Sequence, residues 1–248
     1  MQFEKYDEDE HFDLVPEFFS DVAREPQRFN DFREATEEAF NEIDDVVGMD
    51  ADFDVVLADV DIDQFGEEVP LGLYFRGYSL GKEAHDHAER DIVFLAAPSR
   101  SEYWRPGLKN MAVHEEAHQE FYNHFNDMDH SIWESMVFEG HALSRENTVR
   151  NVKEYEWNGD PRNYDDSAQE VIQILDKHRQ WQGSKYSREN ASSLFSMESS
   201  WEGIGYVIAE QVYTEILDKN SMDVDEPLHR EKDWLRKQVE EAIHKLYP

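Results

Sequence analysis

The chain has 248 residues and a hydrophobic content of 39%, so it can bury a sizeable core as one domain in two lobes. Its 57 acidic residues outnumber 24 basic ones and leave a formal net charge of −33. This excess excludes the clustered Lys and Arg that nucleic acid or an anionic membrane surface requires. The absence of cysteine excludes disulfides, thiolate metal sites and a cysteine nucleophile.

The charge and the N-terminus indicate a cellular setting. A charge of −33 would repel itself strongly in dilute buffer, whereas molar salt shortens the screening length to roughly 3 Å. We therefore expect a halophilic, archaeal protein. The first residues, MQFEKYDEDE, lack the basic and apolar stretches of a signal peptide. No run approaches the ~20 apolar residues of a membrane span, so we expect a cytoplasmic protein.

The first half of the chain combines helical and extended patterns. We expect an acidic, loosely held start over residues 1–13 and helices over 16–24 and 26–47, the longer one with apolar residues at helical spacing. Short apolar or alternating runs, separated by Pro and Gly, predict strands over residues 55–60, 71–75 and 92–97.

The second half is mainly helical. Helices are expected over residues 106–126 and 131–152, the second opened by a capping box from Ser131 to Glu134. Polar loops should follow over 154–167 and 182–193, with helices over 168–181, 201–218 and 229–246. The expected fold class is α+β, with an α/β lobe over 1–126 and a helical lobe over 127–248.

The segment His114-Glu115-Glu116-Ala117-His118 has the form HExxH and lies in the 106–126 helix. The two histidines are about 40° and one turn apart on one helix face, so both imidazoles can reach one ion. Zinc suits imidazole and, with three protein ligands, keeps a fourth place for water. Glu115 lies beside that face, where a carboxylate can take a proton from the water. The motif predicts His114 and His118 as Zn²⁺ ligands and Glu115 as general base.

Three residues are candidates for the third ligand. His124 completes a metzincin spacing, but Phe121 stands where that class turns the chain at a glycine. If the helix continues, His124 lies about 120° away from His118. Asp129 has an aspzincin spacing without the Gly-Thr and Tyr-Gly residues that accompany that aspartate. Glu139 is the preferred candidate.

Glu139 begins the segment Glu139-Gly140-His141-Ala142 in the next expected helix. Counted from the turn between the two helices, Glu139 and His118 are both about 12 Å away, so antiparallel helices would place them level. Gly140 permits close helix approach, and a carboxylate within an apolar stretch needs a partner. The spacing therefore favours Glu139 as the third zinc ligand.

These motifs resemble those of the gluzincins, thermolysin-like zinc peptidases that combine HExxH with a downstream Glu. More narrowly, the chain is similar to an uncharacterised bacterial and archaeal family of predicted zinc-dependent proteases, with HExxH, then E-G-x-A, then a helix bearing Gly-Tyr. The matching segments are residues 113–118, 139–142 and 203–209, within a resemblance over 70–218. The resemblance implies a compact, two-lobed zincin-like fold and hydrolysis of peptide bonds by an activated water.

The resemblance also suggests further roles. Gluzincins add a His or Tyr donor for the oxyanion. Tyr206, in the Gly-Tyr segment, is our candidate, with Tyr213 and His178 as lesser ones; the alternative role of Tyr206 is packing in an apolar helix. Thermolysin-like enzymes often place an Asp four residues after the Glu ligand to orient a histidine. In this chain that position is Leu143. The weaker candidates for orienting a histidine are therefore Glu116, Ser144 and Glu146.

The remaining histidines that we considered are expected to have other roles. His85 and His87 lie in a polar segment that reads as a loop. His141 faces about 200° away from Glu139 on the same helix, so we expect it to be structural or to lie in the outer shell of the site.

Two functions follow from these patterns. The leading one is a zinc-dependent peptidase, a hydrolase acting on peptide or protein substrates with Glu115 as general base. The alternative is a non-catalytic, zinc-stabilised domain that binds peptides or a partner protein. Glu115 favours the enzyme, because a structural zinc site needs ligands but no base. The strand expected over 92–97 could serve as an edge to which a peptide pairs.

Overall fold

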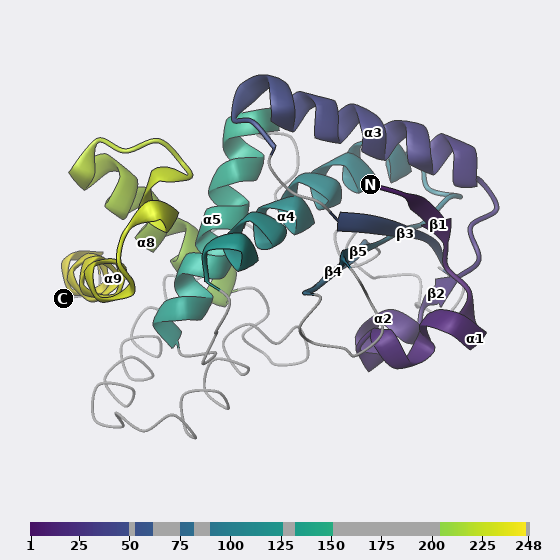
Figure 1. Cartoon of the computed structure of the whole chain (residues 1–248), viewed down its shortest axis with the longest axis horizontal. Coiled ribbons are helices and arrows are strands. Elements are labelled where there is room, and N and C mark those ends of the chain that lie inside the picture. The colour runs from purple at the N-terminus through teal and green to yellow at the C-terminus, as the bar shows by residue number, and fades with distance from the viewer. Residues whose placement is uncertain (50–52, 62–74, 82–89, 126–131, 151–203, 247–248) are drawn as a thin grey trace. The chain divides into compact units, whose positions relative to one another are not determined.

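The computed structural model describes residues 1–49, 53–61, 75–81, 90–125, 132–150 and 204–246. The chain divides into two compact units, Met1–Asn123 and His124–Pro248. The first unit holds a sheet with helices, and the described part of the second unit is helical (Figure 1). The α+β class expected from the sequence is therefore confirmed.

The first unit is built on a five-stranded mixed sheet. Its order is β1 (Phe3–Lys5), β3 (Phe53–Val60), β5 (Asp91–Ala97) and β4 (Arg76–Leu80), and β2 (Ala23–Arg24) pairs with the end of β3. Strands β1, β3 and β5 are parallel, whereas β4 is antiparallel to β5. Most residues of β3 and β5 are buried, as expected for strands covered on both faces. Among the described strands, β4 forms one edge.

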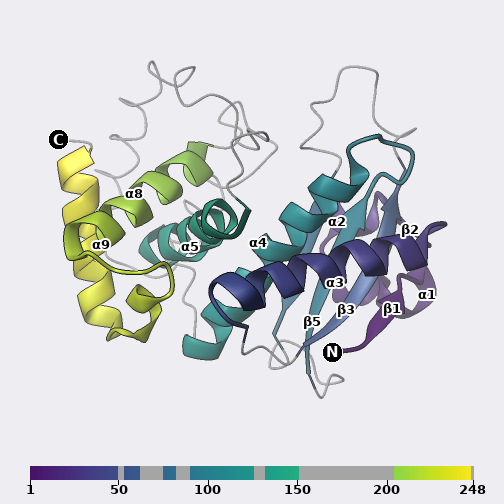
Figure 2. The same cartoon turned by 90° about the horizontal axis from the view of Figure 1, so that it is seen from above.

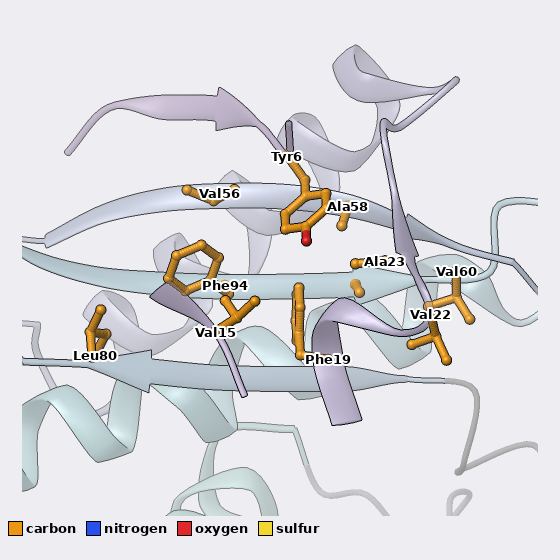
Figure 3. Close-up of a cluster of buried hydrophobic side chains, with 11 residues drawn as sticks. Tyr6, Val15, Phe19, Val22, Ala23, Val56, Ala58, Val60, Leu80 and Phe94 are labelled. Carbon is orange, nitrogen blue, oxygen red and sulfur yellow. The ribbon is translucent and has the colours of Figure 1, made fainter. Parts of the chain in front are cut away.

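The N-terminal segment covers one face of this sheet. It forms α1 (Glu8–His11), the short 3₁₀ helix η1 (Phe12–Leu14) and α2 (Glu17–Ser20), which lie on one side of the strands (Figure 1). Because side chains alternate along a strand, every second residue of β3 points here. These residues, Val56, Ala58 and Val60, join Phe19 and Phe94 in one buried cluster (Figure 3).

Two long helices, α3 (Phe29–Val46) and α4 (Trp104–His124), lie on the opposite face (Figure 2). From α3, Phe40 packs edge-on against Phe53 of β3, with ring centroids 5.4 Å apart. Phe32 of α3 packs against Trp104 of α4 at 5.1 Å. The helix with the HExxH motif is thus packed against α3 at its start.

The second unit contains α5 (Ile132–Arg150), α8 (Ile204–Asn220), the short 3₁₀ helix η6 (Glu226–His229) and α9 (Lys232–Leu246). Helix α8 packs against both α5 and α9 (Figure 2). Helix α5 approaches α8 closely at Gly140. A Cβ there would lie 2.7 Å from Cβ of Tyr213 and closer still to the carbonyl oxygen of Ala209. The close approach expected at Gly140 is therefore found, and its neighbour is α8.

Most expected elements of the described chain are present, with ends shifted by a few residues. The helix expected over 16–24 is shorter, since α2 ends at Ser20 and β2 follows. Residues 71–74 of one expected strand, and the loops and helix expected over 154–193, lie outside the described residues. Within the described part of the chain, no helix has the length and apolar character needed to cross a bilayer.

Two expectations were wrong. The start of the chain is not loosely held, because Phe3–Lys5 pairs with β3 and the buried ring of His11 stacks on Tyr6 at 5.7 Å. The many acidic residues of this segment indicated a solvated chain, whereas a few residues, among them Tyr6 and His11, attach it to the sheet. The strand over 92–97 is not an edge, because β5 lies between β3 and β4.

Candidate metal centre

Helix α4 carries both histidines of the HExxH motif in a buried setting. His114 and His118 are 8% and 5% exposed. Their ring centroids are 4.6 Å apart, with the ring planes at 85°. This is the consequence of a four-residue spacing on a regular helix. The neighbouring Val113 and Ala117 are fully buried and anchor the helix, so the two imidazoles are held close together.

Glu139, the preferred third ligand, is a half-buried residue of α5. Among the described residues, His114, His118 and Glu139 form a group that could hold a metal ion. Each offers one ligand atom, and these atoms lie within 4.8 Å of one another. Two imidazole nitrogens and one carboxylate oxygen are donors that suit a divalent transition metal.

The other candidates for the third ligand have different surroundings. His124 is the last residue of α4 and is exposed. Its ring lies edge-on to His229, with centroids 4.4 Å apart, and both rings line a shallow pocket together with Phe125 and residues 228–232. Asp129 lies outside the described residues, as do His85 and His87.

Glu115, the expected general base, is 5% exposed and lies against β4. The hydroxyl of Ser79 is 2.8 Å from Oε2 of Glu115 and 2.9 Å from its backbone carbonyl oxygen, and it can donate to either. A Cβ placed on Gly77 would lie 2.6 Å from Cδ of Glu115 and closer still to Oε1 and to the sulfur of Met111. Strand β4 therefore supplies a hydrogen-bond donor to Glu115 at Ser79 and leaves room for the carboxylate at Gly77.

Tyr78 lies between these two residues of β4 and points to the other face of the sheet, against the buried cluster of that face. Burial raises the pKa of the Tyr78 phenol, and the negative charge of Glu115 raises it further.

A second polar cluster lies inside the helical unit. His141 is fully buried, and its Nε2 lies 2.7 Å from Oδ1 of Asp225. Arg145, one turn further along α5, donates from Nη1 to the same oxygen at 2.6 Å. Tyr213 is also buried, and its hydroxyl donates to the carbonyl oxygen of Val224 at 2.8 Å. These bonds attach the segment before η6 to α5 and α8, so His141 and Tyr213 have structural partners.

The remaining candidates are placed as follows. Tyr206 lies in the first turn of α8 and is half-buried, and His178 is outside the described residues. The three candidates for orienting a histidine are all buried: Glu116, Ser144 and Glu146.

Two features of the site were missed from the sequence. Ser79 and Gly77 were not recognised as neighbours of Glu115, because 36 residues separate Ser79 from Glu115. Their shared face becomes evident only once β4 is known to pair with β5. Asp225 was also missed as the partner of His141, from which it is 84 residues distant.

The chain was also compared with known proteins. Neither the family models, nor the curated proteins, nor the solved structures include a match to it.

Proposed function

We propose that this protein is a zinc-dependent peptidase. The observation that supports this most is the combination, on one helix, of two buried imidazoles of a potential metal group with a buried carboxylate outside that group. A structural site would need ligands alone. A carboxylate next to the ligands is what general-base hydrolysis requires in addition.

Zinc is the ion that best suits these donors. Catalytic zinc sites commonly use three protein ligands drawn from imidazole and carboxylate, as His114, His118 and Glu139 would provide. The chain has no cysteine, so a thiolate site is excluded. When bound, zinc lowers the pKa of a water molecule to near neutrality and polarises a carbonyl group.

The residues of the chain would then have separate roles in hydrolysis. Glu115 accepts the proton of the attacking water and returns it to the leaving nitrogen of the peptide. A Tyr hydroxyl, for which Tyr206 is our candidate, donates to the oxyanion. We further infer a zincin-like arrangement, in which the antiparallel edge strand β4 pairs with the backbone of an extended peptide substrate.

The test combines metal analysis with a peptide-library digest in molar KCl. We expect one zinc per chain, and less zinc in His114→Ala, His118→Ala and Glu139→Ala. Glu115→Gln keeps its shape but loses the proton acceptor, so it should retain zinc and lose hydrolysis by at least ~10²-fold. Unchanged turnover in Glu115→Gln would refute the mechanism.

Two other outcomes would redirect the proposal. Full zinc in Glu139→Ala, with loss in His124→Ala, would move the assignment to a metzincin-like site. Full zinc in the wild type without cleavage of any library peptide would favour the alternative function, a zinc-stabilised domain that binds peptides or a partner protein.

A further inference from the structure

Strand β4 forms a slot for the carboxylate of Glu115. Gly77 and Ser79 are two residues apart, so both face α4. Ser79 offers its hydroxyl to Oε2 at 2.8 Å, and the missing side chain of Gly77 leaves the space that the carboxylate fills. The slot thus restricts the carboxylate by hydrogen bonding on one side and by close packing on the other.

The strand behind this slot is held firmly. Gly77 is paired with Leu95 and Ser79 with Val93 in the antiparallel register of β4 and β5. Leu95 and Val93 are fully buried, so β4 is anchored to the core of the first unit. A hydroxyl carried by a paired strand orients its acceptor better than one carried by a loop.

Ser79 also provides a hydrogen-bond donor for the buried carboxylate of Glu115. A carboxylate that is removed from water requires hydrogen-bond donors, because its desolvation is costly. A serine hydroxyl has one proton, and here both the carboxylate and the backbone carbonyl of Glu115 are within its reach. Ser79 can therefore donate its one proton to the side chain of Glu115 or to the backbone of α4, both of which lie at the same point on β4.

We propose that Ser79 is a positioning residue for Glu115, an inference that rests on the proposed peptidase function. By holding Oε2, Ser79 fixes the direction from which the carboxylate accepts a proton. Misplacing a reacting group by 1 Å can cost on the order of 10² in rate. Because Ser79 acts through Glu115 and does not hold the substrate, its loss lowers kcat and leaves KM almost unchanged.

The first experiment measures kcat, KM and zinc content in the full-length protein, with an internally quenched peptide selected from the library digest. We expect Ser79→Ala to keep its zinc and lose at least tenfold in kcat. Ser79→Thr keeps the hydroxyl and should recover most of that loss. Ser20→Ala is the matched control, because Ser20 is also buried and its hydroxyl also donates to a helix carbonyl, that of Glu17.

The second experiment needs no activity. Unfolding equilibria of the zinc-free protein are measured for the wild type, Ser79→Ala, Glu115→Ala and the double variant. A hydrogen bond to a charged group predicts a coupling of roughly tenfold or more in the unfolding equilibrium constant. A coupling below about twofold would overturn the proposal, since the two side chains would then act independently.

The two experiments distinguish a failure of the positioning role of Ser79 from a failure of the peptidase function. An active wild type whose Ser79→Ala variant keeps its kcat would overturn the positioning role and leave the peptidase function standing. An inactive wild type would remove the peptidase function, and the positioning role in catalysis with it. The coupling in the zinc-free protein would then still decide whether Ser79 holds the side chain of Glu115.

Discussion

Gly77 is the residue where one added methyl group would test the geometry of the general base. A Cβ there would overlap the carboxylate of Glu115 and the sulfur of Met111, so the carboxylate would have to leave its slot. We expect Gly77→Ala to retain zinc while kcat falls by on the order of 10². Overpacking should also cost roughly 1–3 kcal/mol of stability.

The strand provides its own control for this substitution. A Cβ at Gly81, just after β4, would have no atom of the described residues within 4 Å, so we expect Gly81→Ala to leave kcat and melting temperature unchanged. Both variants can be compared by steady-state kinetics, zinc content and thermal unfolding. Equal kcat in Gly77→Ala and Gly81→Ala would mean that the slot has no part in catalysis.

Tyr206 is the residue proposed to donate to the oxyanion. Tyr206→Phe deletes only the hydroxyl, so zinc content and melting temperature should stay constant. Loss of one such donor typically lowers kcat by on the order of 10²–10³, and we expect at least a tenfold decrease. Unchanged kcat would make Tyr206 a packing residue of α8 and would place the donor elsewhere.

For individual residues of the site, the sequence predicted the neighbours that lie in one short motif better than the neighbours that only folding brings together. His114, Glu115 and His118 are linked by helical spacing alone, so their shared environment could be predicted. Ser79 could not, because no local pattern distinguishes a serine that faces α4 from one that faces solvent. The group with Glu139 was expected from the spacing of two helices, and its ligand atoms are close in the structure.

Among the elements, the segment before η6 is attached to α5 through Asp225. Burial alone would raise the pKa of this carboxyl, but the hydrogen bond from His141 and the charges of His141 and Arg145 outweigh it, so the pKa is lowered. The ionised form is therefore stabilised by folding. Its contribution is present above the unfolded pKa of about 3.9 and is lost as the pH falls through the lower folded pKa.

Asp225→Asn should therefore destabilise the zinc-free protein at neutral pH by roughly 1.5–3 kcal/mol, the range for hydrogen bonds to charged groups. The difference from the wild type should shrink below about pH 4. Asp223→Asn removes an exposed carboxyl from the same segment and should have almost no effect. A difference that stays constant down to about pH 2 would contradict this pKa assignment.

The predictability of the elements followed the strength of their local patterns. The long helices α3 and α4 bury one face at helical spacing, and both were expected from the sequence. Strand β4 was missed, because its sequence RGYSL carries a charge and a glycine and has no apolar run. Strand order was not readable either, since placing β5 between β3 and β4 depends on pairings distant in sequence.

At the scale of the whole molecule, charge is the dominant feature. Even if every basic residue were paired with one acid, the excess of 57 acidic over 24 basic residues would leave 33 carboxylates without a Lys or Arg partner. The first unit does use some of its bases in this way: Arg105 and Lys109 of α4 both bind Glu38 of α3. Ion pairs near a protein surface contribute little stability, so we expect salt to be needed to reduce the repulsion among the remaining carboxylates.

We therefore expect stability to increase with salt. The screening length falls from about 10 Å at 0.1 M to about 3 Å at 1 M, so the melting temperature should rise by at least about 10 °C between 0.1 M and 2 M KCl, which corresponds to roughly 2.5–5 kcal/mol. Circular dichroism measures the melting temperature, and equal values at the two salt concentrations would refute the halophile inference.

Asp44 and Asp45 provide a matched variant, because both are exposed at the C-terminal end of α3, whose last turn has no basic residue. Replacing both with Asn should stabilise the protein in dilute salt, where repulsion and the helix dipole oppose them, and the gain should diminish in 2 M KCl as both effects are screened.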